Sequence, residues 1–566
     1  MADYQPITAE RTFILENVLG ASSQWQQLAP FADIDAALAT QVLGEAGKFV
    51  AQVIAPLNRV GDEVGAQWRK GAVTMPPGFA DAYRQFWQGG WPALAADPAH
   101  GGQGLPAVLE AQLYEMLSGA NHGFTMAPGL LHGAYDCLRH HGSEWLKAQY
   151  LEKIATGEWL ATMCLTEPQA GSDLGLVSTR ALPQADGSHL ISGSKIFISS
   201  GENDLADNIV HLVLAREPGA PAGPKGLSLF LVPKFYPDGT RSAVTCEGIE
   251  EKMGLHASPT CAMRFDNARG WIVGAPGGGL AAMFVMMNAA RLHVALQGLG
   301  LLDAAWQKAD AYARERRQMR APGASAASLL IEHPAMRRIL DTQRAWIDAG
   351  RVLAYQTALE LDIARHHPDA ARRAQAEHWC ALTTPVMKAA FTHQAFHGAS
   401  DCLQVFGGHG YVRESGIEQH VRDARVTMIY EGTNEIQAID LLVRKVLADG
   451  GQNWCTWLEE LAQPLGKTAL AALARTHLQA LRALTPELVA ACHADAALPY
   501  EVADDYLRAA AVALLCWAGS RIEATADSCG EPARWHAPLQ ALQRWIAPEL
   551  PMRCAIISHR LPAAAP

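Results

Sequence analysis

The sequence predicts a multidomain α+β protein in which a β domain lies between helical segments. Its 566 residues, 49% hydrophobic and 18% charged, are enough for several buried cores. Helical periodicity dominates the first 160 residues and returns after residue 279, whereas the residues between form short β-type runs. We therefore expect an N-terminal extension with a helical domain (1–160), a middle β domain (161–279), a helical bundle (280–449) and an extra helical domain (450–566).

The first predicted domain has the composition of helices. From about Asp35 to Leu160 the chain is rich in Ala, Leu, Gln and Glu, and its interruptions carry Gly and Pro, as in DPAHGGQGLP (97–106). The middle domain differs because its apolar runs are short and are divided by Gly, Pro and Asp. The clearest of these predicted strands are 189–201, 208–217, 226–235 and 260–274.

Helical spacing marks the two remaining domains. Apolar residues recur every three or four positions after Asn288, and the small residues APGASAAS (321–328) then predict a loop. Pro334 stands where a proline commonly opens a helix. Beyond Gly451 the Leu/Ala periodicity continues with nearly balanced charge, which favours a packing or oligomerisation domain.

Composition excludes some functions. The net charge of −11 argues against non-specific binding to nucleic acid or anionic lipid. The eleven cysteines include no CxxC pair, as is typical of a reduced cytoplasmic protein. We see no secretory signal, and the apolar stretch 279–287 is too short to span a membrane. His393 and His397 could share a helix face, but without a third ligand we expect no metal site.

A carboxylate follows an apolar run in MIYEGTNEIQ (428–437). Burial of Glu431 would raise its pKa toward neutrality, which suits a general base. The alternative is a surface glutamate at the start of a helix, where acidic residues are favoured. Position alone does not decide between the two.

Three further stretches could bind a ligand. LTEPQAGSD (165–173) combines hydroxyls with Gly and could hold a polar ring or a phosphate, or form an ordinary turn. In SKIFISSG (194–201), Phe197 and Ser199 share a strand face and could stack on a flat ring and bond its edge, although a core phenylalanine is the simpler alternative. The glycines of QVFGGHGY (404–411) permit close approach to an anion, but they do not form a Rossmann GxGxxG.

The order of these motifs resembles that of the acyl-CoA dehydrogenase family. LTEPQAGSD, SKIFISSG, ERRQMR (315–320), QVFGGHGY and RDARVTMIYEGTNEIQ (422–437) follow one another as in that family, over about residues 35 to 448. The N- and C-terminal additions resemble those of its large bacterial members.

The resemblance implies the family fold: a helical N-terminal domain, a middle β-barrel-like domain and a C-terminal four-helix bundle, here with an extra helical C-terminal domain. It implies FAD as cofactor, dehydrogenation of an acyl-CoA to the enoyl-CoA, an electron-transferring flavoprotein as acceptor and a homo-oligomer, dimer or tetramer. An acyl-CoA oxidase, a nucleic-acid-binding flavoprotein of the alkylation-response type and an acyl-CoA-binding scaffold remain alternatives.

The resemblance also assigns residues. Glu431 falls on the catalytic base, whereas Ala290, where some relatives carry the base, offers no carboxylate. The implied FAD contacts are Leu165, Thr166, Ser172, Phe197, Ser199, Arg316, Gln404, Gly407, Gly408 and Thr433. The implied substrate contacts are Ser172, Arg291, Tyr430 and Gly432.

Three departures concern the FAD contacts. Phe197 and Ser199 replace the common Trp and Thr, and Arg316–Arg320 replaces R-x-x-F-G-K. Pro334 stands where glutamine is common.

Overall fold

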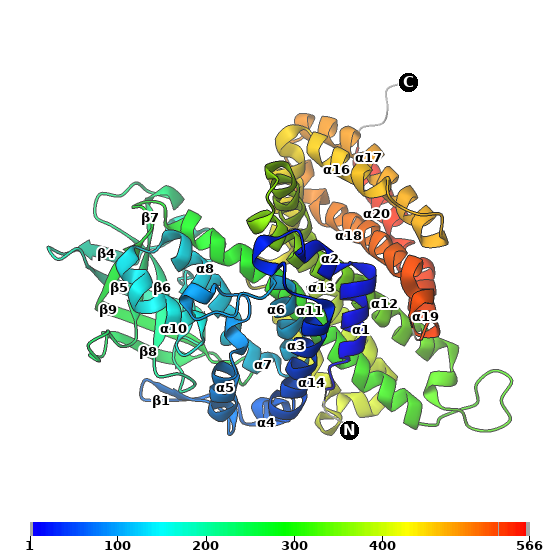
Figure 1. Ribbon diagram of the computed structural model, residues 1–566, viewed down its shortest axis with the longest axis horizontal. Helices are drawn as coiled ribbons and strands as arrows, with labels where there is room; N and C mark the ends of the chain where they lie inside the picture. Colours follow the sequence, from blue (N-terminus) through cyan, green and yellow to red (C-terminus); the bar gives the residue numbers. More distant parts are fainter. Residues whose placement is uncertain (1–3, 530, 562–566) are drawn as a thin grey trace. The chain divides into compact units, whose positions relative to one another are not determined.

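The computed structural model describes residues 4–529 and 531–561, apart from the side chains of residues 288 and 289. It divides into two compact units (Figure 1). Unit 1 comprises Met1–Gly47 and Val294–Pro566, as far as they are described, and unit 2 comprises Lys48–His293.

Unit 2 begins with helices and a small hairpin. The central helix α6 is buried on all sides, so it forms the core of this helical part. A two-stranded antiparallel hairpin, absent from the all-helical prediction, interrupts the helices. The main elements are α4 (Leu57–Val64), β1 (Gln67–Arg69), β2 (Ala72–Thr74), α5 (Phe79–Gln88), α6 (Ala107–Ala120), α7 (His122–Thr125), α8 (Leu131–His141) and α10 (Glu152–Ala155).

The rest of unit 2 is a seven-stranded sheet that closes on itself. Pairing runs β6-β4-β5-β9-β7 and returns from β7 to β6, with β3 added beside β6 and β8 beside β9. Both β6 and β7 are buried almost throughout, so the interior is apolar. The barrel-like prediction is thereby confirmed (Figure 1). The strands are β3 (Leu160–Cys164), β4 (Arg180–Pro183), β5 (His189–Ser199), β6 (Ile209–Arg216), β7 (Leu227–Pro233), β8 (Val244–Ile249) and β9 (Thr260–Val273).

Unit 1 contains the predicted bundle. Helix α11 (Gly279–Glu315) begins in unit 2 and continues into unit 1. It is followed by α12 (Pro334–His366), α13 (Ala370–Val405), α14 (Ile417–Arg425) and α15 (Asn434–Ile439). As predicted, Pro334 opens a helix after the loop at 321–328, whereas α11 begins earlier than Asn288. Gly298 lets α11 approach α13, because a Cβ there would lie 2.8 Å from the Phe391 carbonyl oxygen. By length and composition α11 could cross a membrane, yet 62% of its most apolar stretch is buried inside the protein.

Among the described residues, the C-terminal segment adds five α-helices to unit 1. Helix α18 (Leu498–Thr525) is almost fully buried and packs against α12, α17 and α20, so the extension shares a core with the bundle. The others are α16 (Gln452–Ala462), α17 (Ala469–Ala494), α19 (Ala533–Ala541) and α20 (Glu549–Ser558).

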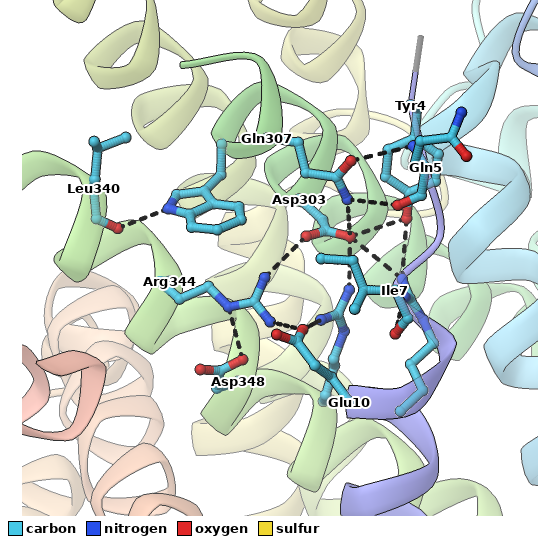
Figure 2. Close-up of polar contacts among 12 residues, drawn as sticks. Tyr4, Gln5, Ile7, Glu10, Asp303, Gln307, Leu340, Arg344 and Asp348 are labelled. Atoms are coloured by element: carbon cyan, nitrogen blue, oxygen red, sulfur yellow. Dashed lines mark hydrogen bonds and ion pairs between the residues drawn. The ribbon is translucent and has the colours of Figure 1, made fainter. Parts of the chain in front are cut away.

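A buried ionic network ties the N-terminal segment to the bundle (Figure 2). The carboxylate of Asp303 on α11 accepts hydrogen bonds from Arg351 on α12 (2.8 Å), from Arg11 (3.3 Å) and from the Tyr4 hydroxyl (2.9 Å). Arg11 lies on α1 (Thr8–Phe13), which is followed in the N-terminal segment by α2 (Ala21–Trp25) and α3 (Ala36–Phe49). This segment therefore belongs with the bundle rather than with the helices that follow it in sequence.

The same network reaches the C-terminal extension. Glu10 pairs with Arg344 on α12 and with Arg534 on α19, and Arg534 also bonds Asp348 at 2.6 Å. Although burial raises the pKa of Glu10, the neighbouring arginines lower it to about 2. Residues from both ends of the chain are therefore held by one set of charges.

Candidate active site

The predicted base lies in a sharp turn of unit 1, between a short 3-10 helix (Val426–Met428) and α15. Glu431 has a left-handed backbone, with φ of 54°, and Gly432 follows with φ of 88°. A left-handed conformation costs a non-glycine residue roughly 1–2 kcal/mol, and such strain is typical of functional positions. At Gly432 a Cβ would also lie 2.7 Å from the side-chain nitrogen of Gln437, so this position requires glycine.

Buried polar side chains hold the backbone of this turn. The ammonium of Lys388 on α13 donates to the Gly432 carbonyl (2.7 Å) and to the Asn434 side chain (3.0 Å). The Gln437 amide donates to the carbonyl of Glu431 at 3.3 Å. Lys388 and Gln437 are both fully buried, so the turn is fixed from behind while the Glu431 side chain is only half-buried.

The residues on either side of Glu431 are also anchored. The hydroxyl of Tyr430 donates to the Gln297 side chain on α11 at 2.6 Å, and burial together with the Glu431 charge raises its pKa well above the usual value. The Thr433 hydroxyl caps α15 by accepting a hydrogen bond from the backbone N–H of Ile436. The structure therefore places Tyr430, Glu431, Gly432 and Thr433 in one ordered turn.

In unit 2 a β-bulge holds an aromatic ring outward. The register of β5 against β9 shifts between Lys195 and Ile198, and within this bulge Phe197 has φ of 57° and is 59% exposed. Ser199 follows, half-buried, at the end of β5. Phe197 is not a core residue, so the alternative of a structural phenylalanine does not apply.

The same bulge is bonded to the loop that follows β3. The backbone N–H of Ile196 donates to the Thr166 carbonyl at 2.9 Å, which places Phe197 beside Leu165 and Thr166, both half-buried. An exposed aromatic ring next to a hydroxyl suits a flat polar ring. The predicted contact Ser172 is exposed in the same loop.

A buried ion pair lies beneath this loop. The ammonium of Lys195 donates to a carboxylate oxygen of Glu167 at 2.9 Å and to the Leu165 carbonyl at 2.9 Å. Burial raises the pKa of Glu167, but Lys195 and hydrogen bonds from Thr179 and Ser178 lower it to about 2. Sequence analysis did not select this pair, although two charges inside the ligand motifs LTEPQAGSD and SKIFISSG were a visible signal.

The predicted diphosphate contacts gather at one end of unit 1. The ring of Tyr312 near the end of α11 stacks on Phe406 after α13, with centroids 4.2 Å apart. Arg316 is exposed just after α11, and Gln404, Gly407 and Gly408 lie where α13 ends. A Cβ at either glycine would contact nothing within 4 Å, so their backbone is open to an anionic group.

Arg291 lies on the part of α11 that belongs to unit 2 and is only 6% exposed. A narrow recess lies next to it, with about 190 Å³ of empty space, none of it wide enough for a water molecule. The lining residues are Gly129, Leu130, Gly133, Met286, Ala290 and His293. Gly133 allows close packing, since a Cβ there would lie 2.8 Å from the Met286 side chain.

Buried charges stand beside this recess, and sequence analysis missed them. His132 bonds Glu110 at 2.9 Å and Asp136 at 3.4 Å, and its ring lies 5.6 Å from that of His293. Burial alone would lower the pKa of His132, but the two carboxylates raise it to about 10. By contrast, burial lowers the pKa of His293 to about 4, so this lining residue is neutral.

The two histidines on α13 do share a face. The rings of His393 and His397 are 4.2 Å apart, and burial lowers the pKa of His393 to about 3. In the described part of the chain, no group of three His, Cys, Asp or Glu side chains is arranged to hold a metal ion.

Three family profiles match the chain in order. The profile described as acyl-CoA dehydrogenase, N-terminal domain matches residues 39–158, the middle-domain profile matches 162–268, and the C-terminal-domain profile matches 277–446. The matched ranges hold all the predicted site residues, whereas the N-terminal segment and the C-terminal extension lie largely outside them.

Two curated relatives cover most of the chain. A 3-methylmercaptopropionyl-CoA dehydrogenase of Ruegeria pomeroyi is 44% identical over 474 residues, which cover 82% of this chain and 80% of the relative. A butyryl-CoA dehydrogenase of Syntrophomonas wolfei is 36% identical over 438 residues, covering 73% of this chain and 71% of the relative.

Two solved structures have a similar fold. An acyl-CoA dehydrogenase complexed with FAD from Bacillus anthracis superposes with a TM-score of 0.78 at 20% identity, over 95% of this chain and 91% of its own. A structure from work on the electron transferring flavoprotein of Acidaminococcus fermentans superposes with a TM-score of 0.61 at 25% identity. The superposition covers 73% of this chain and 98% of the other.

Proposed function

Because the chain belongs to the acyl-CoA dehydrogenase family, we propose that it oxidises a short acyl-CoA thioester to the trans-2-enoyl-CoA with Glu431 as the base. The enzyme is an FAD-dependent oxidoreductase. The observation that carries the assignment of the base is the anchored turn. Glu431 is held in a left-handed conformation by buried Lys388 and Gln437, and its side chain is only half-buried.

The residues present fit FAD. Exposed Phe197 offers a face for the flavin ring, with Thr166 and Ser199 beside it as hydrogen-bonding groups. The open backbone at Gly407 and Gly408, near Arg316, suits the diphosphate. When bound, FAD supplies the acceptor for the hydride that leaves the substrate Cβ.

The reaction requires two contributions from the turn at Glu431. Its carboxylate removes the α-proton, and its backbone N–H donates to the thioester oxygen as negative charge develops there. Gly432 leaves space beside that oxygen, and the bonds of Lys388 and Gln437 to the turn keep the donor in place. General bases of this kind contribute roughly 10²- to 10⁴-fold in rate.

The recess beside Arg291 supports a short acyl group. Ala290, one of its lining residues, occupies the position at which some relatives carry the base, so we place the acyl chain there. The recess is too narrow for a methylene group as it stands, so the flexible Met286 side chain that lines it must move aside when the chain enters. The recess is narrow, and the buried pair of His132 and Glu110 stands next to it. A longer chain would have to separate buried charges, which is costly. The relatives named for 3-methylmercaptopropionyl and butyryl substrates are consistent with this size.

Anaerobic mixing tests the reaction. We expect a short, straight or methylthio-substituted acyl-CoA to bleach the visible absorbance of the bound flavin within one turnover. If no thioester of any length bleaches a protein that is fully loaded with FAD, the proposal is wrong. Hydrogen peroxide release in air would instead favour an acyl-CoA oxidase over transfer to an electron-transferring flavoprotein.

The chain-length preference gives a separate prediction. We expect kcat/KM to fall about tenfold or more for each pair of methylenes beyond the optimum, since they do not fit the recess. Met286→Ala removes the flexible side chain that narrows it and should move the optimum to longer chains. Met253→Ala, at an exposed methionine of the same unit, is the control and should leave the profile unchanged. An unchanged profile in Met286→Ala would place the acyl group elsewhere.

We also propose a homo-oligomer that completes the FAD site. Met319 (80% exposed) and Tyr411 (89% exposed) lie beside the predicted diphosphate contacts, and large exposed apolar side chains are favoured at subunit interfaces.

A further inference from the structure

A fully buried lysine contacts the backbone of the loop that is proposed to hold the flavin ring. The ammonium of Lys195 donates to the Leu165 carbonyl at 2.9 Å. This carbonyl and the N–H of Thr166 belong to one peptide group. The ammonium group is therefore bonded to the oxygen end of the peptide group that carries the Thr166 N–H.

The second partner of Lys195 is also bonded by neutral groups. Glu167 accepts five other hydrogen bonds: from the backbone N–H and the hydroxyl of both Ser178 and Thr179, and from the side chain of Gln169, at 2.6–3.0 Å. Its own backbone is paired with Ala170 in both directions. In a Lys195 variant these neutral donors would still bond the Glu167 carboxylate.

Lys195 is costly to keep in this position. Burying an ammonium group away from water carries a large desolvation penalty even when it is paired. Burial accordingly lowers the pKa of Lys195, an effect that the Glu167 charge opposes. Replacing both Lys195 and Glu167 by apolar side chains of similar volume could cost little stability, so the presence of the ion pair calls for an explanation.

We propose that Lys195 is a positioning residue that raises the reduction potential of the bound FAD by polarising the Leu165–Thr166 peptide group. The inference rests on the proposed function, which places the flavin ring against Thr166 and Phe197. A hydrogen bond from a charged donor is about twice as strong as a neutral one, and hydrogen bonds in a chain strengthen each other. The Thr166 N–H thus becomes a better donor. It stabilises the reduced ring, which is richer in electrons, more than the oxidised ring.

The chain offers a matched control for this lysine. Lys234 lies in the same β domain, is largely buried, pairs with Glu202 and contacts the Asn203 carbonyl at 3.3 Å. It therefore has the same kinds of partner as Lys195, a carboxylate and a backbone carbonyl, but none of them belongs to the Leu165–Thr166 loop. Replacing it tests the general effect of losing a buried lysine.

The experiment compares Lys195→Met, Lys195→Gln and Lys234→Met as FAD-loaded proteins. The reduction potential of the bound FAD is measured by titration against a reference dye, and FAD affinity is measured separately. We expect Lys195→Met to shift the equilibrium about tenfold toward oxidised FAD, which for a two-electron couple is about 30 mV more negative. Lys195→Gln keeps a neutral donor and should give a smaller shift, whereas Lys234→Met should match the unaltered protein.

Several outcomes would overturn the inference. The first is an unchanged reduction potential of the bound FAD in both Lys195 variants. The second is a shift of this potential in Lys234→Met that equals the shift in Lys195→Met. Loss of FAD binding in both Lys195 variants would also overturn it, because the lysine would then be needed for binding rather than for the potential. The reaction is tested apart from this by bleaching of the unaltered protein with acyl-CoA. If acyl-CoA bleaches the unaltered protein but the reduction potential of the Lys195 variants is unchanged, only the role of Lys195 is rejected. If the potential shifts but no acyl-CoA bleaches the unaltered protein, only the reaction is rejected.

Discussion

Replacing Glu431 with glutamine is expected to slow flavin bleaching by the best acyl-CoA by roughly 10²- to 10⁴-fold, the usual contribution of a general base. Glutamine has almost the same size and keeps the backbone N–H, but it cannot accept the α-proton. Because the turn is held through the carbonyls of Glu431 and Gly432, its fold should not depend on the carboxylate. Stopped-flow measurement of the flavin absorbance at saturating substrate gives the rate.

The control for this variant is Glu435→Gln. Glu435 is exposed in the first turn of α15, four residues from the proposed base. The flavin of Glu435→Gln should bleach at the rate of the unaltered protein. Both variants should bind FAD equally well. If the flavin of Glu431→Gln bleaches as fast as that of the unaltered protein, another group removes the α-proton. In that case the anchored turn would have a role in binding alone.

The second large effect is expected at Asp303. This carboxylate is 1% exposed, and Arg11 and Arg351 contact it, as does Arg344 (Figure 2). Asp303→Asn would remove the carboxylate that these three buried guanidinium groups share. Glu10 and Asp348 would remain to balance Arg344 and Arg351. Removing one partner of a buried ionic network costs about 3–5 kcal/mol, which should lower the melting temperature of unit 1 by roughly 5–10 °C.

Asp310→Asn on the same helix is the matched control. Asp310 pairs with Arg314, whose side chain is largely exposed, at 2.7 Å, and exposed pairs of this kind contribute less than about 1 kcal/mol. Calorimetry with both variants measures the difference. Equal melting temperatures for Asp303→Asn and the unaltered protein would show that the network does not hold the N-terminal segment in place.

The network also predicts how stability depends on pH. Burial by itself would raise the pKa of both carboxyl groups. The neighbouring arginines instead lower the pKa of Glu10 to about 2 and hold the pKa of Asp303 well below its usual range. Depressed carboxyl pKa values give stability that is fully present above the unfolded pKa of about 4 and is lost as the pH falls toward 2. The melting temperature of the unaltered protein should therefore fall steeply between pH 4 and 2, and that of Asp303→Asn less steeply.

Local sequence was informative where neighbours along the chain determine structure. The loop at 321–328, the helix opened by Pro334 and the β character of the middle domain all depend on residues a few positions apart, and all are present. The family match likewise follows from short motifs in a fixed order. The role of Glu431 and the FAD contacts stay predictions, which the variants above will test.

Other features depended on residues far apart. Strand alternation put Phe197 and Ser199 on one face, but it did not reveal the bulge that turns Phe197 outward, because the bulge arises from the register against β9. The support of Lys388 for the turn at Glu431 joins residues 44 positions apart. No local pattern could have paired them.

By itself the sequence determined the order of helical and β segments, the family and the residue types that the chemistry needs. These depend on local propensity and on the identity of a few side chains. Only the tertiary structure decided that the described N-terminal residues up to Gly47 join the bundle, that Glu10 pairs with Arg534, and that Lys195 bonds the Leu165 carbonyl. Such contacts form between segments brought together by burial of apolar surface, and the burial in turn requires each enclosed charge to find a partner.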